Sequence, residues 1–352
     1  MAKDYFKERD KENLEKIRQI RKELPSFCNT FFIGIEPSTT VLTRLNYARD
    51  LQVFFRFLSE NIFKKYVSDD YVISDLDKIK STDLEMFADF LTSYEGAGGE
   101  NRMNSPKGKA RKLSAIRTFY NYFYKHDLIN TNPAVKITFP KLREKEIIRL
   151  ESDEVEQLLE TADLGENMTL QEANFHLHTR MRDVAILTLL LGTGIRVSEC
   201  VGLNIDDIDF KINAFTVTRK GGGRVILYFS DEVKAALTDW LAARADIEDV
   251  PSDESALFLS LQKRRISVRA VQLLVKKYSQ KVTTVKNITP HKLRSTYGTS
   301  LYRATHDIYV VAEVLGHKDI NTTKKHYAAM SEDIRRAAAD KVKLKDDGND
   351  DT

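Results

Sequence analysis

The sequence is poor in cysteine, with only Cys28 and Cys200 among 352 residues. Two cysteines cannot build a disulfide framework or a four-cysteine metal site, so we expect isolated reduced thiols. The single tryptophan, Trp240, lies among apolar residues at helical spacing and is expected in the core.

Long apolar runs are also missing. The longest, around residues 184–191, is far too short to span a bilayer. The first 24 residues are densely charged and lack the apolar stretch of a secretory signal. We therefore expect a cytoplasmic protein without a membrane partner.

Charge of one sign is scarce overall, since the net charge is only +3. The last seven residues, DDGNDDT, concentrate negative charge at the C-terminal end, so the rest is more basic than the total suggests. This balance permits nucleic-acid binding but does not require it. A hydrophobic fraction of 42% is enough for a packed core.

The apolar periodicity predicts a mainly α protein with a small antiparallel β-sheet and two domains. Residues 1–132 are expected to form a helical domain, with apolar faces around residues 42–58, 84–94 and 113–123 and a loop over residues 95–109. Asn132-Pro133 ends this region, because a residue before proline disfavours the α conformation. We expect a linker over residues 133–146, a second domain over 147–340 and a charged tail over 341–352.

In the second domain, a helix capped by Ser152 or Asp153 is expected first, then a surface loop over residues 165–178 and a buried helix over 181–191. Short runs rich in β-branched and aromatic residues follow at 207–210, 214–218 and 224–229. The glycine-rich residues 219–223 predict a hairpin turn between the last two runs. From Asp231 onward the pattern returns to helix.

Four stretches of this half carry residues suited to phosphate chemistry. Thr289-Pro290 predicts a helix start that places His291 and Arg294 on one face, beside free backbone N–H groups that suit a phosphate. A turn at residues 192–194 precedes a helix expected to carry Arg196, with Glu199 on the same face. The guanidinium of an arginine can bind two phosphate oxygens at once.

The other two stretches offer a proton donor and a nucleophile. Lys220 lies in the glycine-rich hairpin turn, where it can approach a ligand and donate a proton if neighbouring arginines depress its pKa. His317 follows Leu315-Gly316, and Tyr327 follows ten residues later. Clustered arginines would favour the tyrosine phenolate and a covalent intermediate. Taken singly, each stretch could equally be a basic helix start, an Arg–Glu surface pair, a charged turn or a packing tyrosine.

Together and in this order, the stretches resemble the signature of the tyrosine site-specific recombinases, the phage integrase family. GTGIRVSE, TPHKLRSTYGTSLY and LGHKDINTTKKHY are similar to Xer recombinases and integrases. VTRKGGGR and TPHKLR, with the extended N-terminal region, look most like the single-recombinase Xer type of streptococci and lactococci.

The resemblance implies a role for each matching residue. Tyr327 would attack the scissile phosphorus and form a 3′-phosphotyrosyl link, while Arg196 and Arg294 hold the non-bridging oxygens. Lys220 would protonate the leaving oxygen. His291 would assist proton transfer, His317 would donate a hydrogen bond to the phosphate, and Glu199 would orient the basic residues. The bond energy is kept in the phosphotyrosine, so no cofactor is expected. The positive clamp would replace a metal ion, and the sequence offers no convincing metal-binding cluster, so no bound metal is expected.

The family's two-domain clamp implies double-stranded DNA with a specific recombination site as the partner. One basic cluster lies near the third predicted helix and comprises Arg102, Lys107, Lys109, Arg111, Lys112 and Arg117. A second comprises Lys263, Arg264, Arg265, Arg269, Lys276 and Lys277. We expect both to contact DNA, although a charged run can also be a solvated face.

Two further functions stay open at this level: a type IB topoisomerase-like enzyme that relaxes DNA, and a catalytically inactive DNA-binding protein. Within the recombinase hypothesis, the resemblance implies a homo-tetramer on DNA, by analogy of fold. Resolution of chromosome dimers, integration or excision, and inversion all stay open, as does an accessory translocase or directionality factor.

Overall fold

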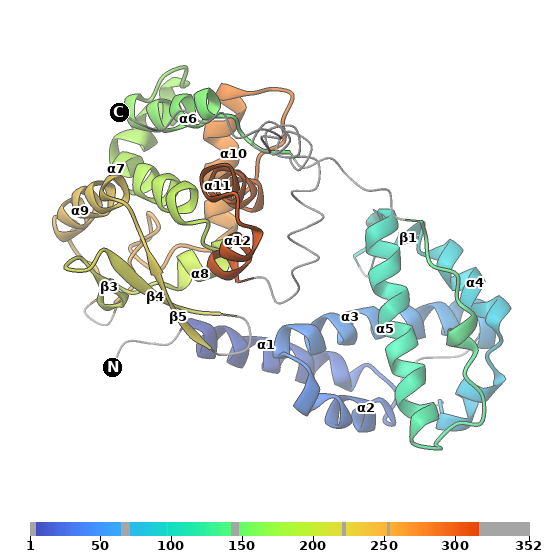
Figure 1. Cartoon of the computed structure of the whole chain (residues 1–352). Helices are drawn as coiled ribbons and strands as arrows, with labels where there is room; N and C mark the ends of the chain where they lie inside the picture. Colours follow the sequence, from blue (N-terminus) through green and yellow to red (C-terminus); the bar gives the residue numbers. More distant parts are fainter. Residues whose placement is uncertain are drawn as a thin grey trace, which may run out of the picture. The chain divides into compact units, whose positions relative to one another are not determined.

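The computed structural model describes residues 5–64, 71–96, 98–141, 148–219, 223–251 and 254–316. The chain divides into two compact units, one within residues 5–141 and one within 148–316. Figure 1 shows the two units. Most described residues are helical, with two small antiparallel sheets, which confirms the predicted fold class.

The first unit is built from helices α1 (Tyr5–Lys22), α2 (Cys28–Gly34), α3 (Val41–Phe57), α4 (Ser81–Phe90) and α5 (Pro106–Lys125). Shorter helical segments are η1 (Glu36–Ser38), η2 (Leu58–Phe63), η3 (Ile73–Lys78) and η4 (Pro133–Lys136). Thr40 and Ser105 accept side-chain hydrogen bonds from the first turns of α3 and α5, respectively, so both helices begin at capping residues.

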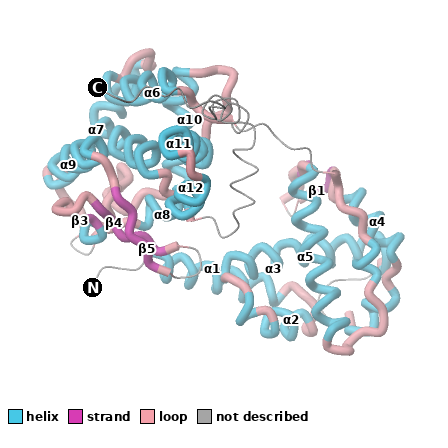
Figure 2. The backbone as a smooth tube through the Cα atoms, in the orientation of Figure 1, coloured by secondary structure: helices cyan, strands magenta, loops and turns pink. Residues whose placement is uncertain are grey.

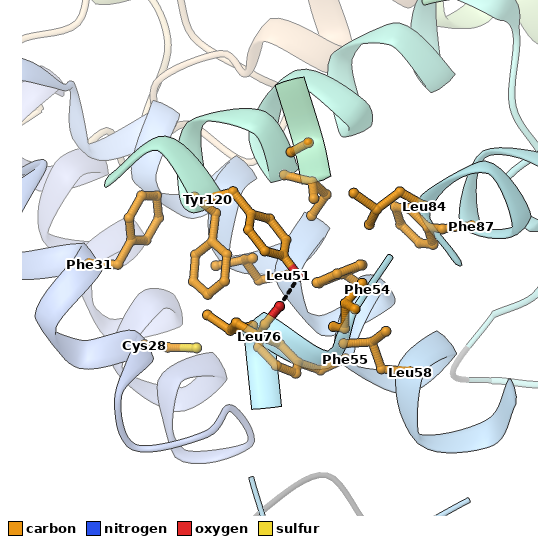
Figure 3. Close-up of a cluster of buried hydrophobic side chains, with 14 of the residues drawn as sticks. Cys28, Phe31, Leu51, Phe54, Phe55, Leu58, Leu76, Leu84, Phe87 and Tyr120 are labelled. Carbon is orange, nitrogen blue, oxygen red and sulfur yellow. Dashed lines mark hydrogen bonds between the residues drawn. The ribbon is translucent and has the colours of Figure 1, made fainter. Parts of the chain in front are cut away.

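Aromatic side chains dominate the core of this helical unit. Figure 3 shows Phe31, Phe54, Phe55, Phe87 and Tyr120 in one buried cluster, in which the hydroxyl of Tyr120 donates to the carbonyl oxygen of Leu76. Most ring pairs meet edge to face, the arrangement that the aromatic quadrupole favours.

Three details differ from the sequence-based expectation. The region expected as a loop over residues 95–109 contains a hairpin of β1 (Ser93–Glu95) and β2 (Asn101–Met103), and α5 already begins at Pro106. Tyr94 lies in β1 and not on a helix. Ala134 and Ile137, expected in an extended linker, are buried in the core of the helical unit.

The second unit contains α6 (Ser152–Leu164), α7 (Leu170–Thr193), α8 (Val197–Gly202), α9 (Asp231–Ala245), α10 (Val268–Val282), α11 (Pro290–Thr305) and α12 (Ile308–Leu315). In Figure 2 the strands β3 (Ile208–Asp209), β4 (Ala214–Thr218) and β5 (Arg224–Tyr228) form an antiparallel sheet in that order, after the short η5 (Ile205–Asp207). Ala214 pairs with Tyr228 and Thr218 with Arg224, so β4 and β5 form the predicted hairpin. Trp240 is buried and donates to the carbonyl oxygen of Leu257, as expected of a core residue.

Two predictions for this unit were wrong. The expected surface loop over residues 165–178 is mostly the first part of α7, which starts at Leu170 because Thr169 and Glu172 form a reciprocal capping box. Helix α6 is capped by Glu151, one residue before the expected Ser152, because the carboxylate of Glu154 accepts from the backbone of Glu151.

Candidate active site

Arg196 is fixed by a buried carboxylate. It stands at the N-cap of α8, just before the helix on which it was expected, because the chain turns at Gly194 with a φ of +60°. The carboxylate of Glu199 accepts from Nη1 of Arg196 at 2.9 Å and from its backbone N–H at 3.1 Å. Glu199 is buried, whereas about a third of the Arg196 side chain (34%) is exposed. The pair therefore presents an oriented guanidinium group to solvent.

Arg294 lies on α11 and is almost fully buried. Its guanidinium donates to the carbonyl oxygens of Gly194 and Leu315. Helix α11 begins with Pro290 as predicted, but the hydroxyl of Thr289 makes no capping hydrogen bond. His291 is exposed one turn before Arg294.

Both arginines bind the C-terminal end of α12. Nη2 of Arg196 donates to the carbonyl oxygen of Gly316 at 3.0 Å, and Arg294 donates to that of Leu315. Because these two carbonyls belong to consecutive residues, the two guanidinium groups lie close together. The last carbonyls of a helix carry partial negative charge and attract cations, which explains why the arginines gather at this end of α12.

A third arginine, Arg219, was not among the predicted site residues. It follows β4 and donates from Nη2 to the carbonyl oxygen of Val314 at 2.8 Å and from Nη1 to that of Glu313 at 3.5 Å. Partial burial lowers the pKa of its guanidinium, Glu199 acts in the opposite direction, and Arg196 lowers it further. Arg219 therefore lies within electrostatic reach of the Arg196–Glu199 pair, a proximity that residue spacing in the sequence could not reveal.

Three predicted site residues lie outside the described residues: Lys220, His317 and Tyr327. Lys220 is the residue after Arg219, and His317 is the residue after Gly316. Each of the four signature stretches therefore has described residues that form the C-terminal end of α12 or donate hydrogen bonds to it, although Tyr327 itself is not described. Among the residues that the structure describes, no group of three or more His, Cys, Asp or Glu side chains could hold a metal ion.

The first basic cluster borders a cleft of the helical unit. Its lining includes Arg102, Arg111 and Lys112 of the predicted set, together with Arg49 and Arg56. Arg111 and Lys112 both pair with Asp50, whose side chain is fully buried. The carboxylate of Asp50 therefore fixes two cations on the cleft wall.

The other members of this cluster differ in their surroundings. Lys107 is exposed, and Arg102 pairs with Glu100. Lys109 donates to the hydroxyl of Thr92. Arg117 donates to the carbonyl oxygens of Ala134 and Ile137, so its guanidinium holds η4 against the helical unit.

In the second cluster, Arg264, Arg269 and Lys276 are exposed, and Lys263 pairs with Asp249. Arg265 instead donates to the carbonyl oxygens of Val201 and Leu203, which gives it a structural role beneath α8. The pKa of Lys277 is lowered by burial, against the opposing effect of Asp183.

Along the described part of the chain, no helix is both long and apolar enough to cross a membrane.

The sequence of this chain matches the model of the phage integrase family over residues 148–333. It is 36% identical over 298 residues to the tyrosine recombinase XerC of Caldanaerobacter subterraneus subsp. tengcongensis, covering 83% of this chain and 79% of the relative. The chain therefore belongs to the phage integrase family and is a tyrosine recombinase.

A second tyrosine recombinase and two solved structures are also similar to this chain. The tyrosine recombinase XerD of Staphylococcus epidermidis is 30% identical over 305 residues, covering 87% of this chain and 94% of the relative. The fold is similar to that of a XerH site-specific recombinase bound to a palindromic difH substrate, with a TM-score of 0.61 and 22% identity over 86% of this chain and 80% of that one. The fold is also similar to that of a Tn1549 transposon integrase in complex with circular intermediate DNA. The TM-score is 0.59 and the sequence identity 21%, over 85% of this chain and 94% of that one. The family match and the two relatives confirm the predicted family and its Xer-like motifs, and the solved structures confirm the fold. The finer likeness to the streptococcal and lactococcal type stays a prediction.

Proposed function

We propose that this protein recombines double-stranded DNA at a specific site through a 3′-phosphotyrosyl intermediate on Tyr327. One observation carries the proposal: Arg196 and Arg294, nearly 100 residues apart in the sequence, bind consecutive carbonyls at the end of α12. Two adjacent guanidinium groups, one of them partly exposed and oriented by Glu199, suit the non-bridging oxygens of a phosphodiester.

The reaction is a transesterification in two reversible steps. The phenolate oxygen of Tyr327 attacks phosphorus, the bond from phosphorus to the 5′-oxygen breaks, and Lys220 gives that oxygen its proton. Arg196 and Arg294 stabilise the negative charge on the non-bridging oxygens of the transition state, His317 donates a further hydrogen bond, and His291 assists proton transfer. A 5′-hydroxyl of the second duplex then attacks the phosphotyrosine, so the chemistry needs no nucleotide or other cofactor.

DNA binding is proposed for both basic clusters, with the cleft lined by Arg102, Arg111 and Lys112 as the part best supported by the structure. Solved relatives of this fold are described as bound to a difH substrate and to circular intermediate DNA, which supports the same class of partner here. Because their guanidinium groups bind the chain's own carbonyls, Arg117 and Arg265 are the weakest members of the proposed interface.

The assembly and cellular role are proposed by analogy with the family. Strand exchange needs two sites held together, which a homo-tetramer on DNA would provide. A translocase or directionality factor would act on this tetramer from outside the active site. The DNA substrate would be the chromosome or a mobile genetic element, and either would place the protein in the cytoplasm. The reaction would resolve chromosome dimers, integrate or excise a mobile element, or invert a DNA segment.

A plasmid assay separates recombination from simple relaxation. The target site is first selected from random-sequence duplexes by their binding to Tyr327→Phe protein, and two copies are then placed on one supercoiled plasmid. We expect deletion or inversion products that require both copies. Relaxed topoisomers without any exchanged product, formed equally well on a one-site plasmid, would contradict the proposal and favour a topoisomerase.

A further inference from the structure

Arg219 joins the hairpin of β4 and β5 to the C-terminal end of α12. Its backbone N–H donates to the carbonyl oxygen of Gly223 at 2.8 Å, across the mouth of the hairpin turn. Its side chain leaves the hairpin and donates to the carbonyl oxygens of Val314 and Glu313. One residue is therefore hydrogen-bonded to two segments that lie more than 90 positions apart in the sequence.

The packing at the α12 end is built around this side chain. Gly316 closes α12 in the left-handed region, with a φ of +61°, and a Cβ added there would lie 1.6 Å from Nη1 of Arg219. The glycine of the Leu315-Gly316-His317 stretch is thus favoured by its backbone conformation, and a side chain at this position would displace the guanidinium of Arg219. Nε of Arg219 is buried and has no hydrogen-bond partner among the described residues, where the guanidinium is held by its two terminal nitrogens.

Each segment that Arg219 connects leads directly to a residue of the proposed reaction. Lys220 is its neighbour in the chain, and His317 is the neighbour of Gly316. In the sequence, Lys220 is followed by three glycines, which offer no side chain that could pack against it. An anchor immediately before Lys220 restricts the conformations from which that lysine can approach a phosphate.

We propose that Arg219 is a positioning residue for the proposed general acid Lys220. It anchors the hairpin to the end of α12, so that Lys220 and His317 can contact the same phosphate. This inference rests on the proposed function. Arg219 acts through Lys220 and does not itself touch the phosphate. Loss of the anchor therefore slows proton donation to the 5′-oxygen and leaves DNA binding in place.

The test compares two substrates that differ in one atom. Suicide duplexes carry either the natural 5′-bridging oxygen or a sulfur at the scissile phosphate. A thiol has a pKa of about 8.5, so the sulfur leaves as a thiolate and needs no general acid. Single-turnover cleavage is measured for wild type, Arg219→Ala and Lys220→Ala, with Arg224→Ala as the matched control because Arg224 is an exposed arginine on the opposite strand of the hairpin.

On the oxygen substrate, we expect the single-turnover cleavage rate to fall roughly 100-fold or more in Lys220→Ala and about 10- to 100-fold in Arg219→Ala. Both losses lie within the range of general acid catalysis. On the sulfur substrate, both variants should recover to within a few-fold of wild type, with Arg224→Ala unchanged on both. Recovery also demonstrates that Arg219→Ala protein is folded and binds DNA.

Three results would overturn the proposal. If Arg219→Ala cleaves the oxygen substrate at the wild-type rate, Lys220 does not need Arg219 to position it. A loss on both substrates, with Lys220→Ala rescued by sulfur, would assign Arg219 to the phosphate or to the fold. If sulfur fails to rescue Lys220→Ala, the proposed role of Lys220 is wrong, which separates failure of the underlying function from failure of the anchor.

Discussion

Arg196 and Glu199 share two hydrogen bonds, one from the guanidinium at 2.9 Å and one from the backbone N–H at 3.1 Å, both to the same buried carboxylate. One acidic side chain thus caps α8 and orients an arginine of the proposed phosphate clamp. The acid therefore acts on the reaction without touching the substrate.

Replacing Glu199 with glutamine tests this arrangement. The amide turns an NH₂ group toward one of the two donors, so one hydrogen bond and the negative charge are lost together. We expect single-turnover DNA cleavage to slow roughly 10-fold or more and the free energy of unfolding to fall by about 1–3 kcal/mol, the usual effect on a buried charged hydrogen bond. Glu232→Gln, at an exposed carboxylate on α9, is the control. Equal cleavage by the two variants would remove Glu199 from the site.

Asp50 offers a separate test in the helical unit. Its carboxylate has no exposed area and binds both Arg111 and Lys112, so Asp50→Asn leaves two cations without their counter-charge. Urea denaturation should show a loss of about 2–3 kcal/mol, somewhat below that for a fully buried pair because half of the Arg111 side chain is exposed. Asp89→Asn, at an exposed carboxylate of the same unit, should change stability by less than about 0.5 kcal/mol. A similar stability of the two variants would argue against the structural role of Asp50.

Gly194 is predicted to tolerate no side chain. Its φ is +60°, and an added Cβ would lie 2.4 Å from Cδ1 of Tyr297, on the helix that carries Arg294. Gly194→Ala should lower the unfolding free energy by about 1–3 kcal/mol and shift the carbonyl that accepts from Arg294. Gly223→Ala is a matched control, because nothing lies within 4 Å of its added Cβ. Thermal unfolding of both variants checks the difference, and equal melting temperatures would contradict it.

The two cysteines provide a test of both cores. Cys28 and Cys200 are buried, and burial raises the pKa of the Cys200 thiol to about 12 and that of Cys28 well above its usual range. Because only the thiolate is a nucleophile, both should stay protonated and unreactive at pH 8. We expect no labelling by a thiol reagent in the native protein and two labels per chain in denaturant. Rapid native labelling of either residue would show that its unit opens more readily than the packing implies.

The sequence was sufficient for the local features. Helical periodicity predicted α3 and α5, and the glycine-rich residues 219–223 predicted the β4–β5 hairpin, because these depend on neighbours in the chain. The start of α7 was missed although its signal, Thr169 with Glu172 three residues later, is visible in the sequence.

Long-range contacts could not be predicted from such local patterns. At short range, the i, i+3 spacing of Arg196 and Glu199 did predict their pairing. The contacts of Arg196, Arg219 and Arg294 with the end of α12 join segments roughly 20 to 120 residues apart, and no local pattern encodes them. The same holds for Arg117 and Arg265, which looked like DNA-binding cations but bind carbonyls of their own chain.

Covalent capture of DNA tests the central claim most directly. Wild-type protein is incubated with a nicked suicide duplex carrying the selected site, and the linked residue is identified by mass spectrometry of the DNA-bound peptide. We predict a 3′-phosphotyrosyl link on Tyr327, and no link for Tyr327→Phe protein that still binds the duplex with nearly unchanged affinity. A covalent complex with Tyr327→Phe, or a link at any other residue of the wild-type protein, would contradict the account.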